Sequence, residues 1–265
     1  MAGDRPAVYR LDLAYDGTNF HGWARQPRVR TVEGELIVAL EKLLRFGPKL
    51  SVAGRTDAGV HAIGQVASFV APLGLDVLRM AQALNGMLGP EVSVARARRA
   101  PNGFDARFSA TARRYRYRLD TAVAPDPFTA RFTWHRPGPL SVGWMRAAAS
   151  ELTGEHDFAS FCRPPQPPGA STVRTLRRLT VASDGRILHV VAEANGFLHQ
   201  MVRSLVGTLI AVGEGRMESN DMTAVLQARD RSAAGQVAPP YGLTLEHVTY
   251  GRGPTRTAGL PPPPA

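Results

Sequence analysis

The stretch 53–62, AGRTDAGVHA, places four polar side chains and two glycines within one short segment. Glycine lets the backbone turn sharply and lets a ligand approach it closely. We therefore expect an exposed turn with Asp57 at its tip, where Arg55 favours the ionised carboxylate. A carboxylate held in this way can act as a nucleophile or as a base. The alternative is a hairpin turn whose aspartate bonds only to its own backbone.

The segments on either side of this stretch predict the strands that position it. Residues 50–53 predict a short strand that enters the turn, and residues 63–70 predict a strand that leaves it. A carboxylate between two strands is held more precisely than one on a free loop. Further upstream, residues 8–15 alternate apolar and polar side chains, which is typical of a half-buried strand. The turn that follows leads to Phe20 and Trp23, which either contact RNA or close the edge of a domain.

Two amphipathic helices are predicted in the same half of the chain. Thr31 can cap the first helix, whose apolar stripe ends before Gly47. The second helix is expected over residues 75–88 and starts near Asp76. Its inward side chains are predicted to be Leu78, Ala81, Leu84 and Leu88.

Residues 54–62, GRTDAGVHA, closely resemble the signature of the tRNA pseudouridine synthases of the TruA type. The resemblance implies that Asp57 is the catalytic nucleophile and that Arg55 is a second cation that keeps it charged. Residues 104–108, FDARF, resemble a segment of the same family that contacts tRNA. This second resemblance implies substrate contacts by Phe104, Arg107 and Phe108. Asp105 departs from the family, which usually carries a histidine at this place.

Residues 112–119, ARRYRYRL, predict a strand with two chemically different faces. Tyr115, Tyr117 and Leu119 would share one face, and three arginines would line the other. One face can stack aromatic rings while the other meets phosphates or carboxylates. The alternative is a sheet edge that is protected by charge. The string resembles the same family, whose active-site tyrosine falls on Tyr115.

A third motif follows an apolar segment in the second half of the chain. Residues 187–194 are apolar on both faces, which predicts a central strand. Residues 195–203, NGFLHQMVR, then lead into a helix on which His199 and Arg203 would share a face. An arginine at the start of an apolar helix is costly unless a carboxylate meets it or it is exposed. The motif resembles a family motif whose arginine pairs with the catalytic aspartate, which implies that role for Arg203 and a substrate contact for His199.

The segment 163–169, RPPQPPG, cannot form regular structure and predicts a surface loop. After it, Thr172 and Arg174 carry a hydroxyl and a guanidinium suited to an RNA backbone, although a solvated loop without a role is the alternative. His61 follows Asp57 by four residues and could form a metal site with His21. Since a metal centre needs three or four ligands, we expect no metal and predict that His61 is structural or contacts the substrate.

The composition of the 265 residues favours an acidic polymer as partner, since the formal net charge is +10. Most basic residues are arginines, which bind phosphate through two parallel bonds, although codon bias is an alternative cause. The single cysteine, Cys162, excludes an intrachain disulfide and a thiolate zinc site. Without a long apolar run or a charged leader, no membrane association is expected, and the location is predicted to be cytoplasmic.

These patterns predict an α+β fold with two subdomains, mostly antiparallel sheets flanked by helices, and a central active-site cleft. The resemblance to the family further implies that the two subdomains are pseudo-symmetric. The expected boundaries are 1–105 for the catalytic subdomain with Asp57, 106–250 for the subdomain with Tyr115 and Arg203, and 251–265 for a disordered tail. The resemblance covers the chain from about residue 8 to about residue 250.

The resemblance further implies a homodimeric isomerase that converts uridine to pseudouridine at positions 38–40 of the tRNA anticodon arm. This reaction requires no metal or nucleotide cofactor, in agreement with the lack of a dinucleotide or phosphate-loop fingerprint. Two alternatives are a non-catalytic RNA-binding protein of the same fold and a metal-dependent hydrolase that uses Asp57, His61 and His21.

Overall fold

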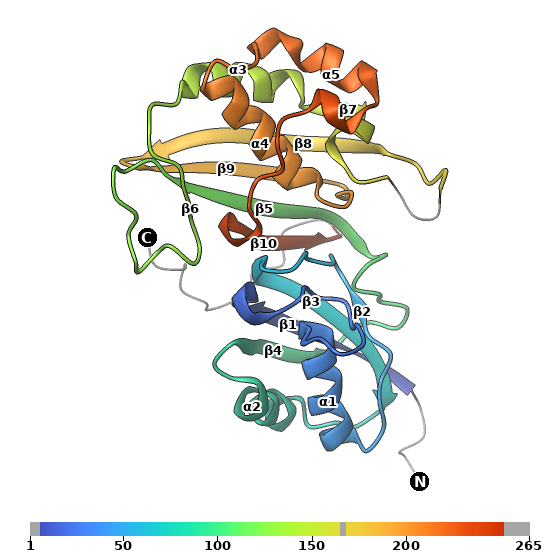
Figure 1. Cartoon of the computed structure of the whole chain (residues 1–265). Coiled ribbons are helices and arrows are strands. Elements are labelled where there is room, and N and C mark those ends of the chain that lie inside the picture. The colour runs from blue at the N-terminus through green and yellow to red at the C-terminus, as the bar shows by residue number, and fades with distance from the viewer. Residues whose placement is uncertain (1–5, 165–167, 252–265) are drawn as a thin grey trace. The chain divides into compact units, whose positions relative to one another are not determined.

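The computed structural model describes residues 6–164 and 168–251, which form two compact units (Figure 1). The first unit comprises the described residues 6–111 and 245–251, and the second comprises residues 112–244 except the three that are not described. The division differs from the expected one in two places. The chain passes into the second unit after Thr111 rather than after Asp105, and the last strand returns to the first unit. The expected disordered tail lies outside the described residues apart from Gly251.

The first unit contains strands in the order β4-β1-β3-β10, and the short strand β2 pairs with β3. The pairs β1–β4, β1–β3 and β2–β3 are antiparallel. Tyr9, Leu11 and Leu13 on β1 are buried, as the alternation predicted. β10 comes from the far end of the chain. Its place in this sheet was not predicted, because no local sequence pattern specifies which distant strand it pairs with. The strands are β1 (Pro6–Tyr15), β2 (Ser51–Val52), β3 (His61–Pro72), β4 (Val92–Arg99) and β10 (Leu243–Tyr250).

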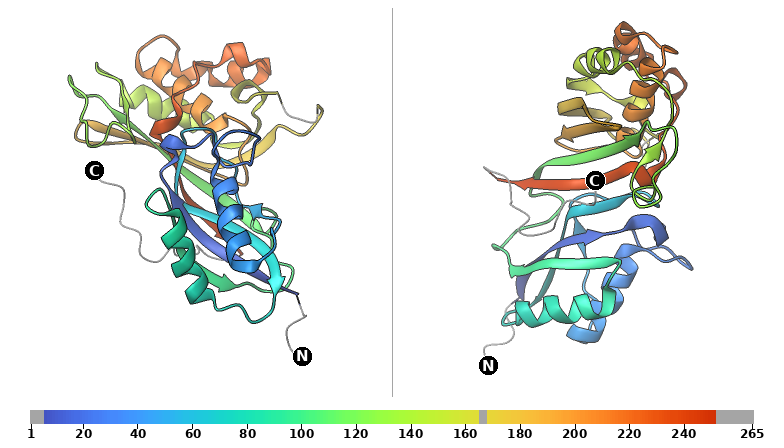
Figure 2. Two further views of the ribbon diagram at one scale, coloured as in Figure 1. Left: turned by 60° about the horizontal axis from the view of Figure 1, so that its bottom comes forward. Right: turned by 90° about the vertical axis from the view of Figure 1, so that its left-hand side faces the viewer.

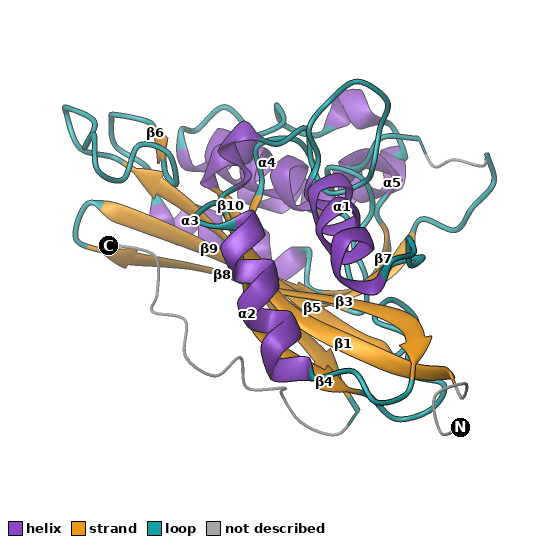
Figure 3. Ribbon diagram, turned by 90° about the horizontal axis from the view of Figure 1, so that it is seen from below, coloured by secondary structure: helices purple, strands orange, loops and turns teal. Residues whose placement is uncertain are grey.

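Helices α1 (Val32–Leu44) and α2 (Val77–Leu88) lie against one face of this sheet (Figure 3). The Thr31 and Asp76 side chains cap them by accepting hydrogen bonds from first-turn amides, as predicted. The prediction that Leu78 faces inward was wrong, since this side chain is 73% exposed. The buried stripe of α2 is instead Met80, Leu84 and Leu88, which recur every four residues.

The second unit contains a sheet in the order β7-β8-β9-β5, in which the pairs are antiparallel, while β6 pairs in parallel with β5. The prediction of a central strand over residues 187–194 is confirmed, because β9 pairs with both β5 and β8. The strands are β5 (Ala110–Asp120), β6 (Trp134–His135), β7 (Gly154–Asp157), β8 (Val173–Asp184) and β9 (Ile187–Ala194).

Helices α3 (Val142–Glu151), α4 (Met201–Gly213) and α5 (Met222–Ala228) gather on one face of the second sheet (Figure 2). Most of α4 is buried, which agrees with its apolar sequence. Gly207 allows this helix to approach a neighbouring loop, since an added Cβ would lie 1.6 Å from the Gln236 carbonyl oxygen. The short 3₁₀ helices are η1 (Gly17–Asn19), η2 (Ala159–Phe161), η3 (Ser219–Asp221), η4 (Arg231–Ala233) and η5 (Pro240–Gly242).

The α+β class, with mostly antiparallel sheets flanked by helices, is therefore confirmed. In the described part of the chain, every helix is too short or too polar to cross a membrane.

Candidate active site

Asp57 lies on a tight turn between β2 and β3, as the sequence predicted. Its backbone carbonyl accepts a hydrogen bond of 3.1 Å from the Val60 amide, and Gly59 adopts a left-handed conformation with φ of 78°. The Asp57 side chain is half-buried, whereas Arg55 is exposed. The turn therefore presents a carboxylate near the surface of the first unit, where a substrate can reach it.

A buried group of polar side chains holds the residue before Asp57. The Thr56 hydroxyl lies 2.8 Å from the Tyr15 hydroxyl, and both groups are buried. The Gln65 amide nitrogen donates to the Tyr15 oxygen at 3.2 Å and to the Gly54 carbonyl at 2.7 Å. Burial raises the pKa of Tyr15 to about 12, so this side chain is a neutral hydroxyl at ordinary pH. The backbone on both sides of Arg55 is therefore tied to the sheet.

The segment after β1 forms a second support for the Asp57 turn. The Trp23 amide donates to the Thr56 carbonyl at 3.0 Å, and the Gly59 amide donates to the Phe20 carbonyl at 3.3 Å. Gly22, with φ of 87°, makes this contact possible, because a Cβ there would lie 2.7 Å from the Thr56 oxygen. The rings of Phe20 and Trp23 are buried, which favours the prediction that they close the edge of the unit rather than contact RNA.

His61 is almost fully buried, with 2% of its surface exposed. Its Nδ1 lies 3.0 Å from the Gly17 amide nitrogen and 3.2 Å from an Asp16 carboxylate oxygen. A side chain in this position fixes the loop behind the Asp57 turn, so the burial supports the structural role and not the expected substrate contact. Within residues 6–164 and 168–251, acidic, histidine and cysteine side chains form no group of three or more that could hold a metal ion.

The segment 104–108 is anchored to the sheet by Asp105. The Asp105 carboxylate accepts hydrogen bonds from the Ser51 hydroxyl and from the amides of Arg107 and Phe108, at 2.7–2.8 Å. Burial alone would raise the pKa of Asp105, but these hydrogen bonds outweigh it and lower the pKa. The residue that departs from the family therefore acts as a structural anchor for the loop.

This anchoring places the segment away from the Asp57 turn. The Ala106 amide bonds to the Ser68 hydroxyl at 2.9 Å, whereas the turn ends beside Ala62 at the start of β3. The six residue steps from Ala62 to Ser68 along β3 span about 20 Å. Phe108 is 80% exposed, while the Phe104 ring packs against another aromatic side chain. The structure therefore separates Phe104, Arg107 and Phe108 from the Asp57 turn within the first unit.

In the second unit, β5 has the two faces that the sequence predicted. Tyr115, Tyr117 and Leu119 are buried, and the intervening arginines are half-exposed. The Tyr115 ring contacts the Phe197 ring edge-on, with 5.2 Å between the centroids. On the other face, Arg114 pairs with a neighbouring carboxylate on β9. Tyr115 thus presents an aromatic ring next to the loop that precedes α4.

Arg203 lies in the first turn of α4, and its guanidinium is held in place. Its Nε donates to the Ala238 carbonyl at 2.7 Å, while the Ala238 amide donates to the Arg203 carbonyl at 3.1 Å. The expectation that His199 shares a helical face with Arg203 was wrong. The helix begins at Met201, and Gln200 before it is left-handed with φ of 64°, so exposed His199 belongs to the preceding turn.

Thr172 and Arg174 lie at the start of β8, and His199 lies in the turn before α4. The Arg163 amide donates to the His199 carbonyl at 3.2 Å, which joins the start of the Pro-rich loop to the turn before α4. The Thr172 hydroxyl binds the Asp157 carboxylate, and Arg174 Nη1 donates to the Ser171 carbonyl at 3.0 Å. Residues 165–167 of the Pro-rich loop lie outside the described residues.

Sequence reasoning missed the buried support of the turn by Tyr15 and Gln65. The available signals were a tyrosine at the end of an alternating strand and a glutamine within an apolar one. Neither signal by itself indicated a role at the turn, because the contacts of Tyr15 and Gln65 form only when the strands pair.

The half-buried Asp57 carboxylate on its supported turn is a group suited to nucleophilic or acid–base chemistry. A family model described as tRNA pseudouridine synthase matches residues 13–109 and 148–251. The chain belongs to this family. The matched ranges include Asp57 and Arg203, whereas Tyr115 falls between them.

Individual relatives agree with the family match. A protein of Frankia casuarinae named tRNA pseudouridine synthase A is 48% identical over 268 residues, with 97% of each chain covered. A relative of the same name from Leifsonia xyli subsp. xyli is 43% identical and covers 97% of this chain and 98% of its own length. A third, from Bartonella quintana, is 40% identical over 91% of this chain and 99% of its own.

Proposed function

We propose that this chain is an isomerase that converts uridine to pseudouridine in tRNA. The observation that carries the proposal is the family match over the ranges that hold Asp57 and Arg203, combined with the half-buried position of Asp57 on its turn. The resemblance of the motifs to the TruA type further suggests positions 38–40 of the anticodon arm as targets. Non-catalytic RNA binding is the less favoured alternative, because the nucleophile motif is intact.

In the proposed reaction, the bond between ribose C1′ and uracil N1 breaks, and the base turns and rejoins C1′ through C5. The C5 proton leaves and N1 takes up a proton, so the isomerisation is balanced without an oxidant or reductant. Asp57 acts as the nucleophile, at either C6 of the base or C1′ of the sugar. The target uridine leaves its stack to reach the carboxylate, which costs a few kcal/mol that pocket contacts offset.

The proposed partners of Asp57 are Arg203, Arg55 and Tyr115. Arg203 and Arg55 supply positive charge that keeps the nucleophile ionised. The bond from Arg203 Nε to the Ala238 carbonyl supports this role, since it fixes the position of the guanidinium. Tyr115 stacks on the base or assists removal of the C5 proton. Its contact with Phe197 supports a fixed ring orientation.

Other proposed substrate contacts are the exposed or half-exposed groups Arg107, Phe108, Thr172, Arg174 and His199. The two arginines in this set would contact the phosphate backbone and make binding dependent on salt. Phe104 is addressed in the next subsection. We also propose that the protein works in the cytoplasm, where tRNA is found, and as a homodimer, which the motif resemblance suggests.

The test is release of tritium from tRNA labelled at uridine C5. Only a reaction that replaces the C5 hydrogen frees the label, so wild-type protein should release it. Asp57→Asn should abolish release while tRNA binding persists, because the substitution removes the nucleophile at nearly constant size. Asp184→Asn, an exposed position at the end of β8, is the matched control and should retain activity. Folded wild-type protein that binds tRNA but releases no tritium would favour the non-catalytic alternative.

A further inference from the structure

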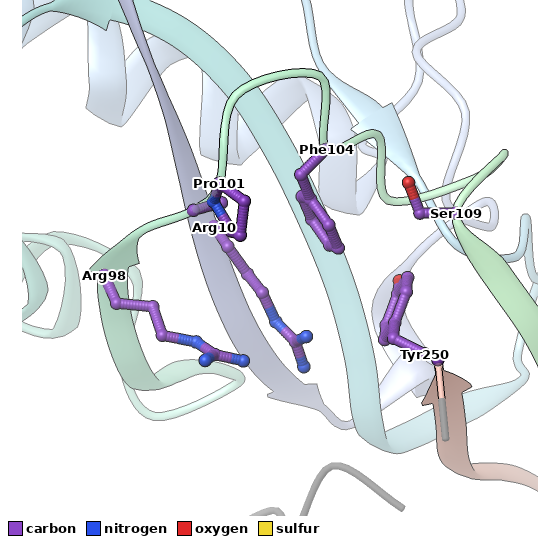
Figure 4. A pocket seen from close by; sticks show the side chains of 8 residues that line it. Arg10, Arg98, Pro101, Phe104, Ser109 and Tyr250 are labelled. Atoms are coloured by element: carbon purple, nitrogen blue, oxygen red, sulfur yellow. The ribbon is translucent and has the colours of Figure 1, made fainter. Parts of the chain in front are cut away.

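A pocket of about 470 Å³ opens on the first unit (Figure 4). Arg10 and Arg98 line one part of it, and Phe104 and Tyr250 line another. The two rings lie 5.0 Å apart between centroids, and the Arg10 guanidinium lies 4.7 Å from the Tyr250 ring. Its volume falls within the range of small-molecule sites. The pocket thus combines cations with aromatic surface.

The charges in this pocket are unbalanced. Arg10 on β1 is directly opposite Arg98 on β4, and Asp12 is opposite Arg96. Like charges opposite each other in a sheet are unfavourable. The cluster therefore holds three guanidinium groups and one carboxylate. Asp12 bonds closely to Arg10, with 2.7 Å to its Nε, but approaches Arg98 only to 4.0 Å.

The charge of Arg98 is only weakly compensated, because Asp12 approaches it no closer than 4.0 Å. Its Nε is buried and has no hydrogen-bond partner among the described residues. Burial and the nearby Arg10 both lower the pKa of the Arg98 guanidinium, since each disfavours its positive charge. An anion that binds the exposed part of the Arg98 side chain, 41% of which is accessible, would supply the missing negative charge.

We propose that this pocket binds one nucleotide of the tRNA, with its phosphate on Arg98 and its base or ribose against Phe104 and Tyr250. The inference rests on the proposed action on tRNA. A phosphate satisfies a guanidinium through charged hydrogen bonds, and aromatic rings stack on bases without regard to sequence. The pocket gives Phe104 a specific place among the substrate contacts predicted from the sequence.

The bound nucleotide is not the uridine that reacts. Arg10 precedes Tyr15 by five residues on β1, and Tyr15 contacts Thr56 beside Asp57. This part of the strand spans about 17 Å, which is too far for one nucleotide to occupy both places. The pocket should therefore contribute to affinity for tRNA and leave the chemical step unchanged.

The experiment measures tRNA affinity at several salt concentrations for four proteins. Arg98→Gln should weaken binding about tenfold and reduce the slope of log affinity against log salt by about 0.9, the loss of one phosphate contact. Arg98→Lys should restore most of both quantities. Arg79→Gln is the matched control, because it removes the same charge from α2, where the Arg79 side chain is 87% exposed. Equal effects of Arg98→Gln and Arg79→Gln would overturn the proposal.

The aromatic contribution is tested separately. Phe104→Leu keeps an apolar side chain but removes the ring face, so affinity should fall about tenfold with an unchanged salt slope. Single-turnover release of tritium at saturating Arg98→Gln enzyme should equal that of wild type. A slower chemical step, or a changed oligomeric state in Arg98→Gln, would overturn the proposal. Absence of release from wild type would count against the proposed reaction, while the binding series would still report on the pocket.

Discussion

The hydroxyl of Tyr15 lies 2.8 Å from the hydroxyl of Thr56, although the two residues are 41 positions apart in the chain. This buried contact joins the end of β1 to the residue that precedes the proposed nucleophile. A catalytic side chain is effective only when its neighbours fix its position, and errors of about 1 Å can reduce rates about a hundredfold. The contact therefore connects the packing of the first unit to the proposed chemistry.

Thr56→Val tests this connection, since it removes the hydroxyl and nearly preserves the shape. We expect the free energy of unfolding to fall by about 1–2 kcal/mol, because the buried Tyr15 oxygen loses a partner. We also expect kcat to fall at least tenfold with little change in KM. Steady-state tritium release and denaturant unfolding measure these effects. Thr180→Val, at an exposed position of β8, should change neither, and an unchanged kcat in Thr56→Val would contradict the positioning role.

Gly22→Ala separates backbone strain from displacement of the turn. Gly22 and Gly74 both have positive φ, of 87° and 102°, so alanine costs about 1–2 kcal/mol at either position. Only at position 22 would the new Cβ meet the turn, at 2.7 Å from the Thr56 oxygen. We expect Gly22→Ala to lose more stability than Gly74→Ala, because of this additional contact, and Gly22→Ala alone to lose activity. Equal activity of the two folded variants would show that the contact does not position Asp57.

Gly64→Ala tests the pairing of β3 with β10. An added Cβ would lie 2.1 Å from the Glu246 carbonyl oxygen, so the strands would have to separate. We expect the free energy of unfolding to fall by about 3 kcal/mol, as in other overpacked sites. Gly86→Ala is the contrasting change, because α2 has open space there and alanine favours helix by about 1 kcal/mol. Thermal or denaturant unfolding would distinguish the two, and a neutral Gly64→Ala would contradict the close strand contact.

Protonation of Glu91 at acidic pH should lower the stability of the folded protein. Hydrogen bonds from Asn19 and then Arg30 lower the pKa of Glu91 below its ordinary value of 4.5. A lowered native pKa means that the unfolded chain binds the proton more readily. The stabilisation is therefore present above about pH 4.5 and is lost as the pH falls below it. Glu91→Gln should reduce stability at pH 7 by about 0.5–1 kcal/mol and flatten the acid dependence. A variant whose stability still falls in parallel with wild type below pH 4.5 would contradict this linkage.

Local patterns predicted much of the fold. The alternation in β5, the caps of α1 and α2 and the apolar β9 all follow from short stretches of sequence. Leu78 was misassigned because Leu78 and Met80 are both apolar and both lie near the start of α2. Only Met80 lies on the buried stripe with Leu84 and Leu88. His199 was misassigned because the left-handed Gln200 delays the start of α4.

The site was predictable as a motif but not as a set of contacts. Asp57 and Arg55 were predicted from residue types and spacing, and Tyr115 from the resemblance to the family, whereas the hydrogen bond between Tyr15 and Thr56 depends on strand register. The same holds for Arg10 and Arg98, which become neighbours only because β1 and β4 pair antiparallel. Periodicity reports which face a residue occupies, and register reports which residue it meets.

The return of β10 to the first unit has a consequence for biosynthesis. A ribosome completes β1 through β4 long before it reaches Leu243, so the nascent first unit lacks the strand that pairs with β3. An unpaired edge is a template for intermolecular association. Truncation before Leu243 should therefore yield an aggregation-prone product. In the full chain, the sheet of the first unit is completed only when translation is nearly finished.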